Sequence, residues 1–239
     1  MRSEFDELYN ALFANADLYI NVVKSMAGHH EGMSRDEIAK ATGVSGGTLT
    51  RVLTNLERCD FIARSRNFGQ KSKDTIYRLV DFYTLFYYKF IMQDTAGDEQ
   101  WWSHNFESRA VSVWQGLTFE TVCLMHTDCI KRALGISGMA TEISAWRKTA
   151  GEGEKGGQID LIIKRADRII HLCEMKFSKS EYRITDAYEQ LLRERLELFQ
   201  SSTKTTFSLV ITFVTTYGVA DGLHHSLVHS EVTMEQLFY

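Results

Sequence analysis

Three residues in the second half of the chain have the types and spacing of a metal-dependent hydrolytic site: Asp160, Glu174 and Lys176. Asp160 lies in the apolar segment 159–164, and the other two lie in a second apolar segment, 169–177. Both segments have the composition of β-strands, in which side chains alternate between the two faces. We therefore expect Glu174 and Lys176 to share one face of a sheet.

A short turn at 166–168 joins the two segments, so they should form an antiparallel hairpin. The register of that hairpin places Asp160 beside Glu174, while Met175 should point into the core. Uncompensated charges on such strands would cost several kcal/mol. Bound Mg²⁺ or Mn²⁺ would compensate them, because these ions take carboxylate and phosphate oxygens. Lys176 would then orient the attacking water or neutralise charge that develops on the phosphate.

The elements that must position these residues follow the order helix, three strands, helix, strand. The apolar pattern predicts the helices at 117–134 and 185–199. Strands are predicted at 143–146, 159–164, 169–177 and 207–215, with a last strand at 227–232. The segment 207–215 is dense in Leu, Val, Ile and Phe, which is typical of a central strand covered on both faces.

Asp160 followed by Glu174-x-Lys176, in this element order, resembles the PD-(D/E)XK nuclease superfamily. The resemblance implies a restriction-nuclease-like αβββαβ domain that hydrolyses DNA with Mg²⁺ or Mn²⁺. It also implies a third carboxylate from the first helix, where Glu120 stands, and a Gln or Tyr on the later helix, where Gln190 and Tyr188 stand. The proline that names the motif is absent, since Gln158-Ile159 precedes Asp160.

The N-terminal part of the chain has the element order of a winged helix-turn-helix. Helices are predicted at 8–27, at 35–42 and from Ser45, followed by strands at 61–64 and 75–79. Ser34 and Glu37 have the spacing of a capping box. The inner face of the third helix should consist of Leu49, Val52, Leu53 and Leu56.

A basic cluster favours DNA binding by this module, because residues 58–78 hold six basic side chains and two acidic ones. The third helix would enter the major groove and the loop of the wing would contact phosphates. The candidate DNA-binding residues are Thr48, Arg51, Asn55, Arg58, Arg64, Arg66, Lys71 and Lys73. The alternative is a packing module whose basic loop is simply solvated.

A closer resemblance covers nearly the whole chain. Residues 77–82, 116–120, 157–160 and 173–177 resemble the C-terminal half of a bacterial and archaeal AAA-type ATPase family. That half consists of a winged helix and an uncharacterised nuclease-like domain. The resemblance implies an ATPase domain or subunit as a partner, but the chain contains no G-x-x-x-x-G-K-[ST] motif, so no ATP chemistry is assigned to it.

The composition of the chain argues against several other classes of protein. The 239 residues carry a net charge of −4, which argues against a surface that is basic throughout. No apolar run is long enough to cross a bilayer, so we expect a cytoplasmic protein. The four scattered cysteines have the pattern of buried, reduced thiols rather than of a disulfide framework.

The fold class that the sequence predicts is α/β (mixed α+β), in three segments. They are a winged helix-turn-helix at 1–80, a linking aromatic helix and boundary at 81–100, and a nuclease-like domain at 101–239. The function that this arrangement favours is metal-dependent hydrolysis of DNA. The alternatives are a catalytically inactive DNA-binding regulator and an interaction module that serves an ATPase.

Overall fold

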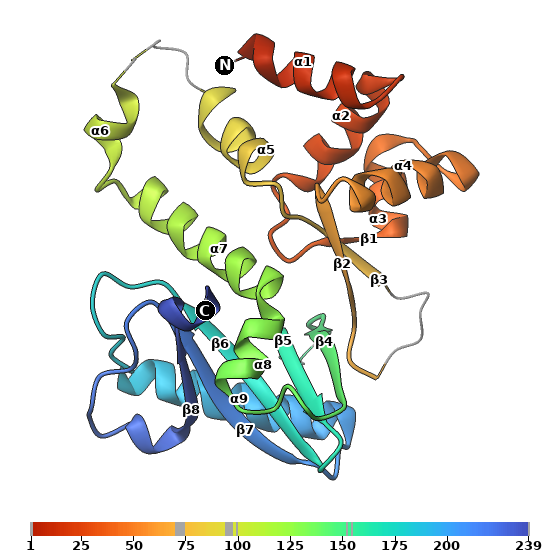
Figure 1. Ribbon diagram of the computed structural model, residues 1–239. Coiled ribbons are helices and arrows are strands. Elements are labelled where there is room, and N and C mark those ends of the chain that lie inside the picture. The colour runs from red at the N-terminus through yellow and green to blue at the C-terminus, as the bar shows by residue number, and fades with distance from the viewer. Residues whose placement is uncertain are drawn as a thin grey trace. The chain divides into compact units, whose positions relative to one another are not determined.

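The computed structural model describes residues 2–69, 75–93, 98, 100–151, 153 and 155–238 (Figure 1). These residues divide into two units. The first comprises the described residues up to Glu107, apart from 67–69, and the second comprises 67–69 and the described residues from Ser108 onward. Among the described residues, none of the helices combines the length and the apolar character needed to span a bilayer.

The first unit has the predicted order of helices followed by a β-hairpin. Its strands pair antiparallel in the order β1-β3-β2. The elements are α1 (Arg2–Leu12), α2 (Ala16–Met26), β1 (Met33–Ser34), α3 (Arg35–Thr42), α4 (Gly46–Arg58), β2 (Ile62–Arg66) and β3 (Thr75–Leu79). This is the architecture of a winged helix-turn-helix, with α4 in the position of the recognition helix.

Two local predictions in this unit are confirmed. Ser34 accepts a hydrogen bond from the backbone of Glu37, whose side chain accepts one from the backbone of Ser34, so the capping box begins α3. The helix ends at Gly43, which has a φ of 72°. The predicted inner face of α4 is buried in full, at Leu49, Val52, Leu53 and Leu56.

The single helix predicted at 8–27 is wrong, because the structure has α1 and α2 with a turn between them. Phe13, in this turn, stacks on Tyr19 of α2, with the ring centroids 3.9 Å apart. On one continuous helix, residues six positions apart would differ by about 240° around the axis and could not stack. The break therefore brings two aromatic rings into the same core, where Tyr9 is also fully buried.

The aromatic helix predicted within 81–100 consists of α5 (Phe82–Phe86) and a π-helical turn, η2 (Tyr87–Ile91). Tyr87 stacks on Phe5, with the ring centroids 3.8 Å apart. The hydroxyl groups of Thr84 and Tyr9 form a buried hydrogen bond. The segment thus completes the core of the first unit. The short helix α6 (Trp101–Asn105) belongs to the same unit, where Trp102 contacts Phe86.

The strands described in the second unit form one sheet, in the order β4-β5-β6-β7-β8. The pairs β4/β5 and β5/β6 are antiparallel, and β6/β7 and β7/β8 are parallel. The elements are α7 (Arg109–Met125), α8 (Thr127–Ala133), β4 (Thr141–Lys148), β5 (Gly157–Arg165), β6 (Ile169–Lys176), α9 (Asp186–Thr203), β7 (Ser208–Thr215) and β8 (Val228–Thr233). This order agrees with the predicted helix, three strands, helix, strand.

The sheet has a core on each face. Phe119, Cys123 and Ile130 of α7 and α8 pack with Met175 and Val214 on one face. On the other face, residues of α9 such as Leu192 and Phe199 pack against β5, β6 and β7, and Figure 1 shows α9 on the opposite side of the sheet from α8. Strand β7 is therefore covered on both sides, as its composition predicts.

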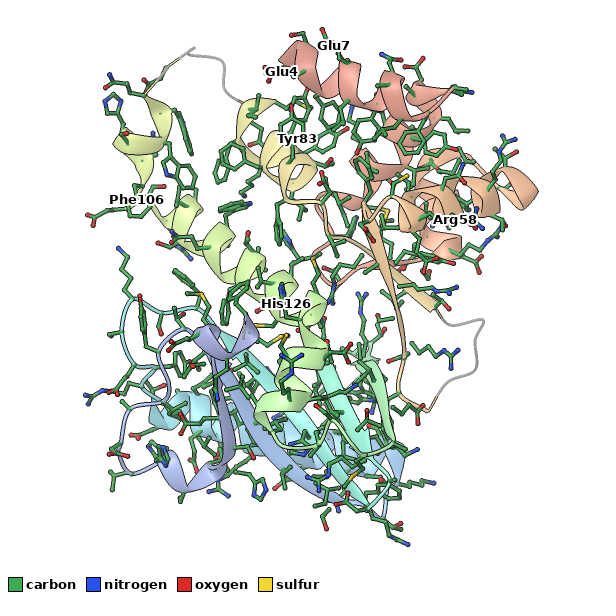
Figure 2. All side chains as sticks on the ribbon, in the orientation of Figure 1. Glu4, Glu7, Arg58, Tyr83, Phe106 and His126 are labelled. Atoms are coloured by element: carbon green, nitrogen blue, oxygen red, sulfur yellow. The ribbon has the colours of Figure 1, made fainter. Side chains whose placement is uncertain are left out.

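Two details of this unit, and one cysteine of the first unit, differ from expectation. The helix predicted at 117–134 begins earlier and is broken at His126, whose ring nitrogen lies 2.8 Å from the carbonyl of Val122 (Figure 2). Strand β4 is longer than the predicted 143–146. Of the cysteines, Cys123 and Cys173 are buried, but Cys59 is exposed, contrary to the prediction.

His171 of β6 is a buried titratable group, with 2% of its surface exposed. Arg165 donates to its Nε2 at 3.2 Å, so Nδ1 carries the proton and donates to Thr212 at 2.8 Å. Burial first, and then the charges of Arg165 and His229, lower the pKa of His171 to about 4, although Asp167 opposes the shift. The imidazole is therefore neutral in the folded protein at neutral pH.

We expect this histidine to make the protein acid-labile between about pH 6.5 and 4. Its folded pKa lies below its unfolded value, so the unfolded chain takes up the proton first and stability falls as pH falls. The loss can reach about 3 kcal/mol. Urea unfolding at pH 7, 5.5 and 4.5 should give a shallower dependence on pH for His171→Gln than for the wild type. Equal slopes would contradict the assignment.

Candidate active site

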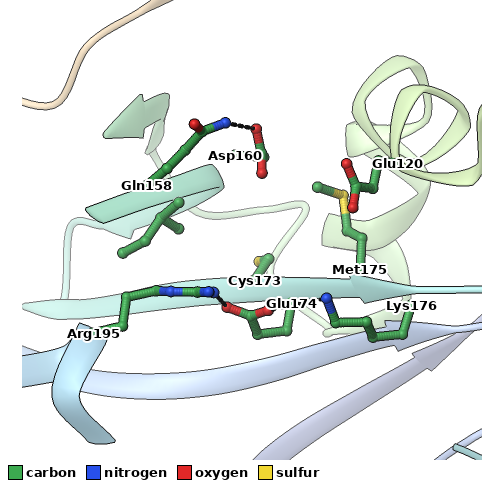
Figure 3. A pocket seen from close by; sticks show the side chains of 9 residues that line it. Glu120, Gln158, Asp160, Cys173, Glu174, Met175, Lys176 and Arg195 are labelled. Atoms are coloured by element: carbon green, nitrogen blue, oxygen red, sulfur yellow. Dashed lines mark hydrogen bonds and ion pairs between the residues drawn. The ribbon is translucent and has the colours of Figure 1, made fainter. Parts of the chain in front are cut away.

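A cavity of about 200 Å³ collects the residues that the sequence singled out. It opens where β5 and β6 stop pairing, since the last ladder pair is Leu161 with Cys173. Asp160 and Glu174 are the next residues along each strand, as the hairpin prediction requires. The cavity is lined by Glu120, Gln158, Ile159, Asp160, Cys173, Glu174, Met175, Lys176 and Arg195 (Figure 3).

A β-bulge sets the position of Asp160. Strand β4 pairs Ser144 with Ile162 and Trp146 with Ile159, so β5 uses one residue more than β4 over this stretch. As a result Ile159 and Ile162 pack in the same core cluster, which strict alternation would forbid. Such bulges re-aim side chains beside functional sites. Gln158 holds the re-aimed carboxylate by donating to Asp160 Oδ1 at 2.8 Å.

Just before this bulge, a side chain would clash with the backbone at Gly156 and would be tight at Gly157. A Cβ on Gly157 would lie 3.0 Å from Trp146 and from Leu198 of α9. A Cβ on Gly156 would lie 2.9 Å from the carbonyl of Lys148 and from the backbone nitrogen of Ala150. The close approach of backbone and side chains therefore explains the Gly-Gly pair that precedes Gln158.

Glu174 is the most buried charged group of the cavity, with 7% of its surface exposed. Its Oε1 is paired with Nη1 of Arg195, and its Oε2 accepts a hydrogen bond from the hydroxyl of Tyr188 at 2.6 Å. Nζ of Lys176 lies 3.8 Å from the same Oε2. These groups offset the cost of burying the carboxylate.

Lys176 and Glu174 lie on the same face of β6, while Met175 is buried in the core, as predicted. The ammonium of Lys176 also lies 5.0 Å from the centre of the Tyr188 ring, which is a cation–π distance. Tyr188 thus contacts both candidate site residues of β6, Glu174 and Lys176. Burial, and then the negative charge of Glu174, raise the pKa of the Tyr188 phenol, so it remains a donor.

The other residues suggested by the resemblance differ in their placement. Glu120 of α7 lines the cavity opposite the strand carboxylates (Figure 3). Gln190 does not line it, because its amide donates to Glu194 at 3.1 Å on the exposed side of α9.

Arg195 is a site residue that the sequence reasoning missed. The run Arg193-Glu194-Arg195 has the appearance of a solvated helix surface. A signal was present nonetheless, because Tyr188, Leu192, Arg195 and Phe199 share one helical stripe of spacing four, three and four.

The donor set of the cavity suits a hard divalent cation, since its carboxylates are the oxygen ligands that Mg²⁺ and Mn²⁺ take. Within the described part of the chain, however, no three His, Cys, Asp or Glu side chains are already grouped as ligands. Glu174 uses its oxygens on Arg195 and Tyr188 instead. The chemistry of the residues fits a metal, and their arrangement corresponds to a site that must rearrange to bind one.

The winged helix presents part of the predicted DNA-binding set to solvent. Thr48, Arg51 and Arg58 of α4 are exposed, with Arg58 in its last turn (Figure 2). Asn55 is half-buried, and its amide donates to the hydroxyl of Tyr19 at 2.7 Å, so this donor serves the fold. Arg35, which the sequence did not single out, donates to the carbonyl of Gly46 at 2.7 Å and steadies the start of α4.

The wing residues are only partly described. Arg66 is exposed, and Arg64 forms an ion pair of 2.7 Å with Glu57 of α4. Lys71 and Lys73 lie outside the described residues.

Comparison with known proteins adds one finding. No curated protein and no solved structure gives a significant match to the chain. Residues 25–69 match the MarR family, a stretch that runs from the end of α2 through α3, α4 and β2. The first unit therefore contains a winged helix similar to that of the MarR family.

Proposed function

We propose that the chain binds DNA through its winged helix and hydrolyses phosphodiester bonds in the cavity of its second unit with Mg²⁺ or Mn²⁺. The observation that carries the hydrolytic proposal is that one cavity gathers Glu120, Asp160, Glu174 and Lys176 from α7, β5 and β6. A cluster of charged groups from three elements in one cavity, at the open end of an otherwise apolar sheet, is typical of a functional site.

The residues would divide the chemistry among them. Asp160 and Glu174 would hold the metal, with Glu120 assisting, and the metal would polarise the phosphate and lower the pKa of bound water. Lys176 would orient the attacking water and stabilise the charge that develops on the phosphate. Tyr188 would keep Glu174 and Lys176 in place through its hydrogen bond and its ring.

The order of elements supports the resemblance to PD-(D/E)XK nucleases. Helix α7 with α8, strands β4 to β6, helix α9 and strand β7 follow in that order, and the two motif segments occupy neighbouring strands. The resemblance also implies that an ATPase domain or subunit works with this chain. Such a partner would supply the ATP chemistry that the chain's own sequence lacks.

The DNA-binding part rests on the match to the MarR family and on the exposed side chains of α4. Winged helices of the MarR type bind DNA, and the exposure of Thr48, Arg51 and Arg58 on α4 supports a role for them in binding. A second candidate function is a DNA-binding regulator without catalysis. The pairing of Glu174 with Arg195 and Tyr188 favours it, because a carboxylate that is satisfied within the protein does not require a metal.

We expect Asp160→Ala to abolish Mn²⁺ binding, measured by calorimetry, and to reduce Mn²⁺-dependent cleavage of duplex DNA by roughly a hundredfold or more. Loss of one of two carboxylate ligands is the physical reason. The matched control is Asp221→Ala, which changes an exposed aspartate of the same unit and should behave as the wild type. Wild-type binding and cleavage in a folded Asp160→Ala protein would refute the hydrolytic proposal.

A separate prediction tests the winged helix. Arg51→Ala should weaken duplex binding and reduce the slope of log affinity against log salt by about one, since one positive charge at the DNA surface is lost. Fluorescence anisotropy at several salt concentrations measures both quantities. Lys24→Ala, at an exposed position of α2, serves as the control. If Arg51→Ala and Lys24→Ala have the same small effect, α4 is not the binding helix.

A further inference from the structure

Helix α9 directs an arginine at the sheet, in a stripe that is otherwise apolar or aromatic. Leu192 and Phe199 of this stripe are buried, with 2% and 0% of their surfaces exposed. The side chain of Arg195 keeps 24% of its surface exposed, compared with 56% for its neighbour Arg193. Since an inward arginine is costly without a partner, its partner in the cavity explains its position.

That partner is Glu174. Nη1 of Arg195 contacts Oε1 of Glu174, while the hydroxyl of Tyr188 occupies Oε2. Burial lowers the pKa of Arg195, but attraction to Glu174, with contributions from Tyr188 and Asp160, more than offsets this and raises that pKa above its ordinary value. The guanidinium is thus attracted to both of the strand carboxylates that the proposed metal would use.

A divalent cation and the guanidinium would compete for this position. A cation held by Asp160 and Glu174 would bind the same carboxylate of Glu174 that Arg195 contacts. Like charges a few ångströms apart in a partly buried cavity also repel each other strongly. Binding of the cation therefore requires that Arg195 leave Glu174.

Once it is released from Glu174, Arg195 could bind a phosphate group in the same cavity. Its planar guanidinium presents paired N–H donors whose geometry matches two oxygens of one phosphate. Arg195 lines the same cavity as Lys176, so the phosphodiester that approaches the metal would lie within its reach.

We propose that Arg195 is an exchangeable counter-ion: it holds Glu174 in the resting site, gives way to a divalent cation, and then binds the phosphodiester. The inference rests on the proposed metal-dependent function, to which it adds a phosphodiester-binding residue and a coupling between the two ligands. Cation and phosphodiester bind cooperatively, and each raises the affinity for the other by the same factor. The resting protein consequently has low affinity for the cation alone.

The first experiment is a calorimetric titration of Mn²⁺ into the full chain. Arg195→Met removes the competing charge and should tighten Mn²⁺ binding roughly tenfold or more. The matched control is Arg193→Met, two residues away on the same helix, where the arginine pairs with Glu189 outside the cavity. This control should bind Mn²⁺ as the wild type does, and circular dichroism checks that each variant is folded.

The second experiment repeats the Mn²⁺ titration in the presence of dimethyl phosphate, the simplest phosphodiester. The wild type should gain affinity for Mn²⁺, and Arg195→Met should not. Arg195→Lys retains the charge but lacks the planar fork, so it should bind Mn²⁺ as weakly as the wild type and gain little from the phosphodiester. Because Arg195→Lys preserves the ion pair with Glu174, it keeps the test valid if Arg195→Met does not fold.

The outcomes separate this inference from the proposed function. Tighter Mn²⁺ binding in Arg195→Met, or loss of the phosphodiester effect in Arg195→Lys, supports the counter-ion role. If the wild type and both variants bind Mn²⁺ equally, with equal gains from dimethyl phosphate, the metal site stands and the role of Arg195 is overturned. If neither the wild type nor Arg195→Met binds Mn²⁺, the metal site itself fails, and the inference fails with it.

Discussion

The negative charge of the buried Glu174 must be offset by nearby donors and positive charges. The elements of the second unit bring those groups to it. Tyr188 and Arg195 reach it from α9, and Lys176 reaches it from its own strand. For these contacts to form, α9 must pack across this face of the sheet with Tyr188 and Arg195 directed at the cavity. The crossover from β6 to β7 by way of α9 achieves this, because it returns the helix over the strand that it has just left.

At the end of the β5/β6 ladder, the sheet carries charged side chains next to a continuous apolar core. Pairing between β5 and β6 ends at Leu161 and Cys173, so the apolar part of each strand is complete before the charged part begins. The bulge in β5 then turns Asp160 independently of the alternation that fixes Leu161 and Ile162. Regular pairing thus extends the apolar core at one end of the strands, and an irregularity sets the geometry of the candidate site at the other.

Residues that are close in sequence were sufficient to predict much of this structure. The capping box of Ser34 and the inner face of α4 depend on neighbours in sequence, and the placement of Asp160 near Glu174 depends on a short hairpin. Features that depend on distant partners could not be derived in this way. The break between α1 and α2 follows from the stacking of Phe13 on Tyr19, Asn55 is taken up by Tyr19, and the inward position of Arg195 depends on a carboxylate on another element.

The segment at residues 67–69 belongs to the second unit, although the chain on both sides of it belongs to the first. Asn67 forms a bridge with Ala145 of the edge strand β4, and Phe68 packs against Phe199. An uncovered edge strand is a template for intermolecular pairing and aggregation. A truncated protein that begins at 101 would therefore expose the outer edge of β4 and the ring of Phe199. A single cut in the chain consequently cannot separate the two units without removing a part of the second.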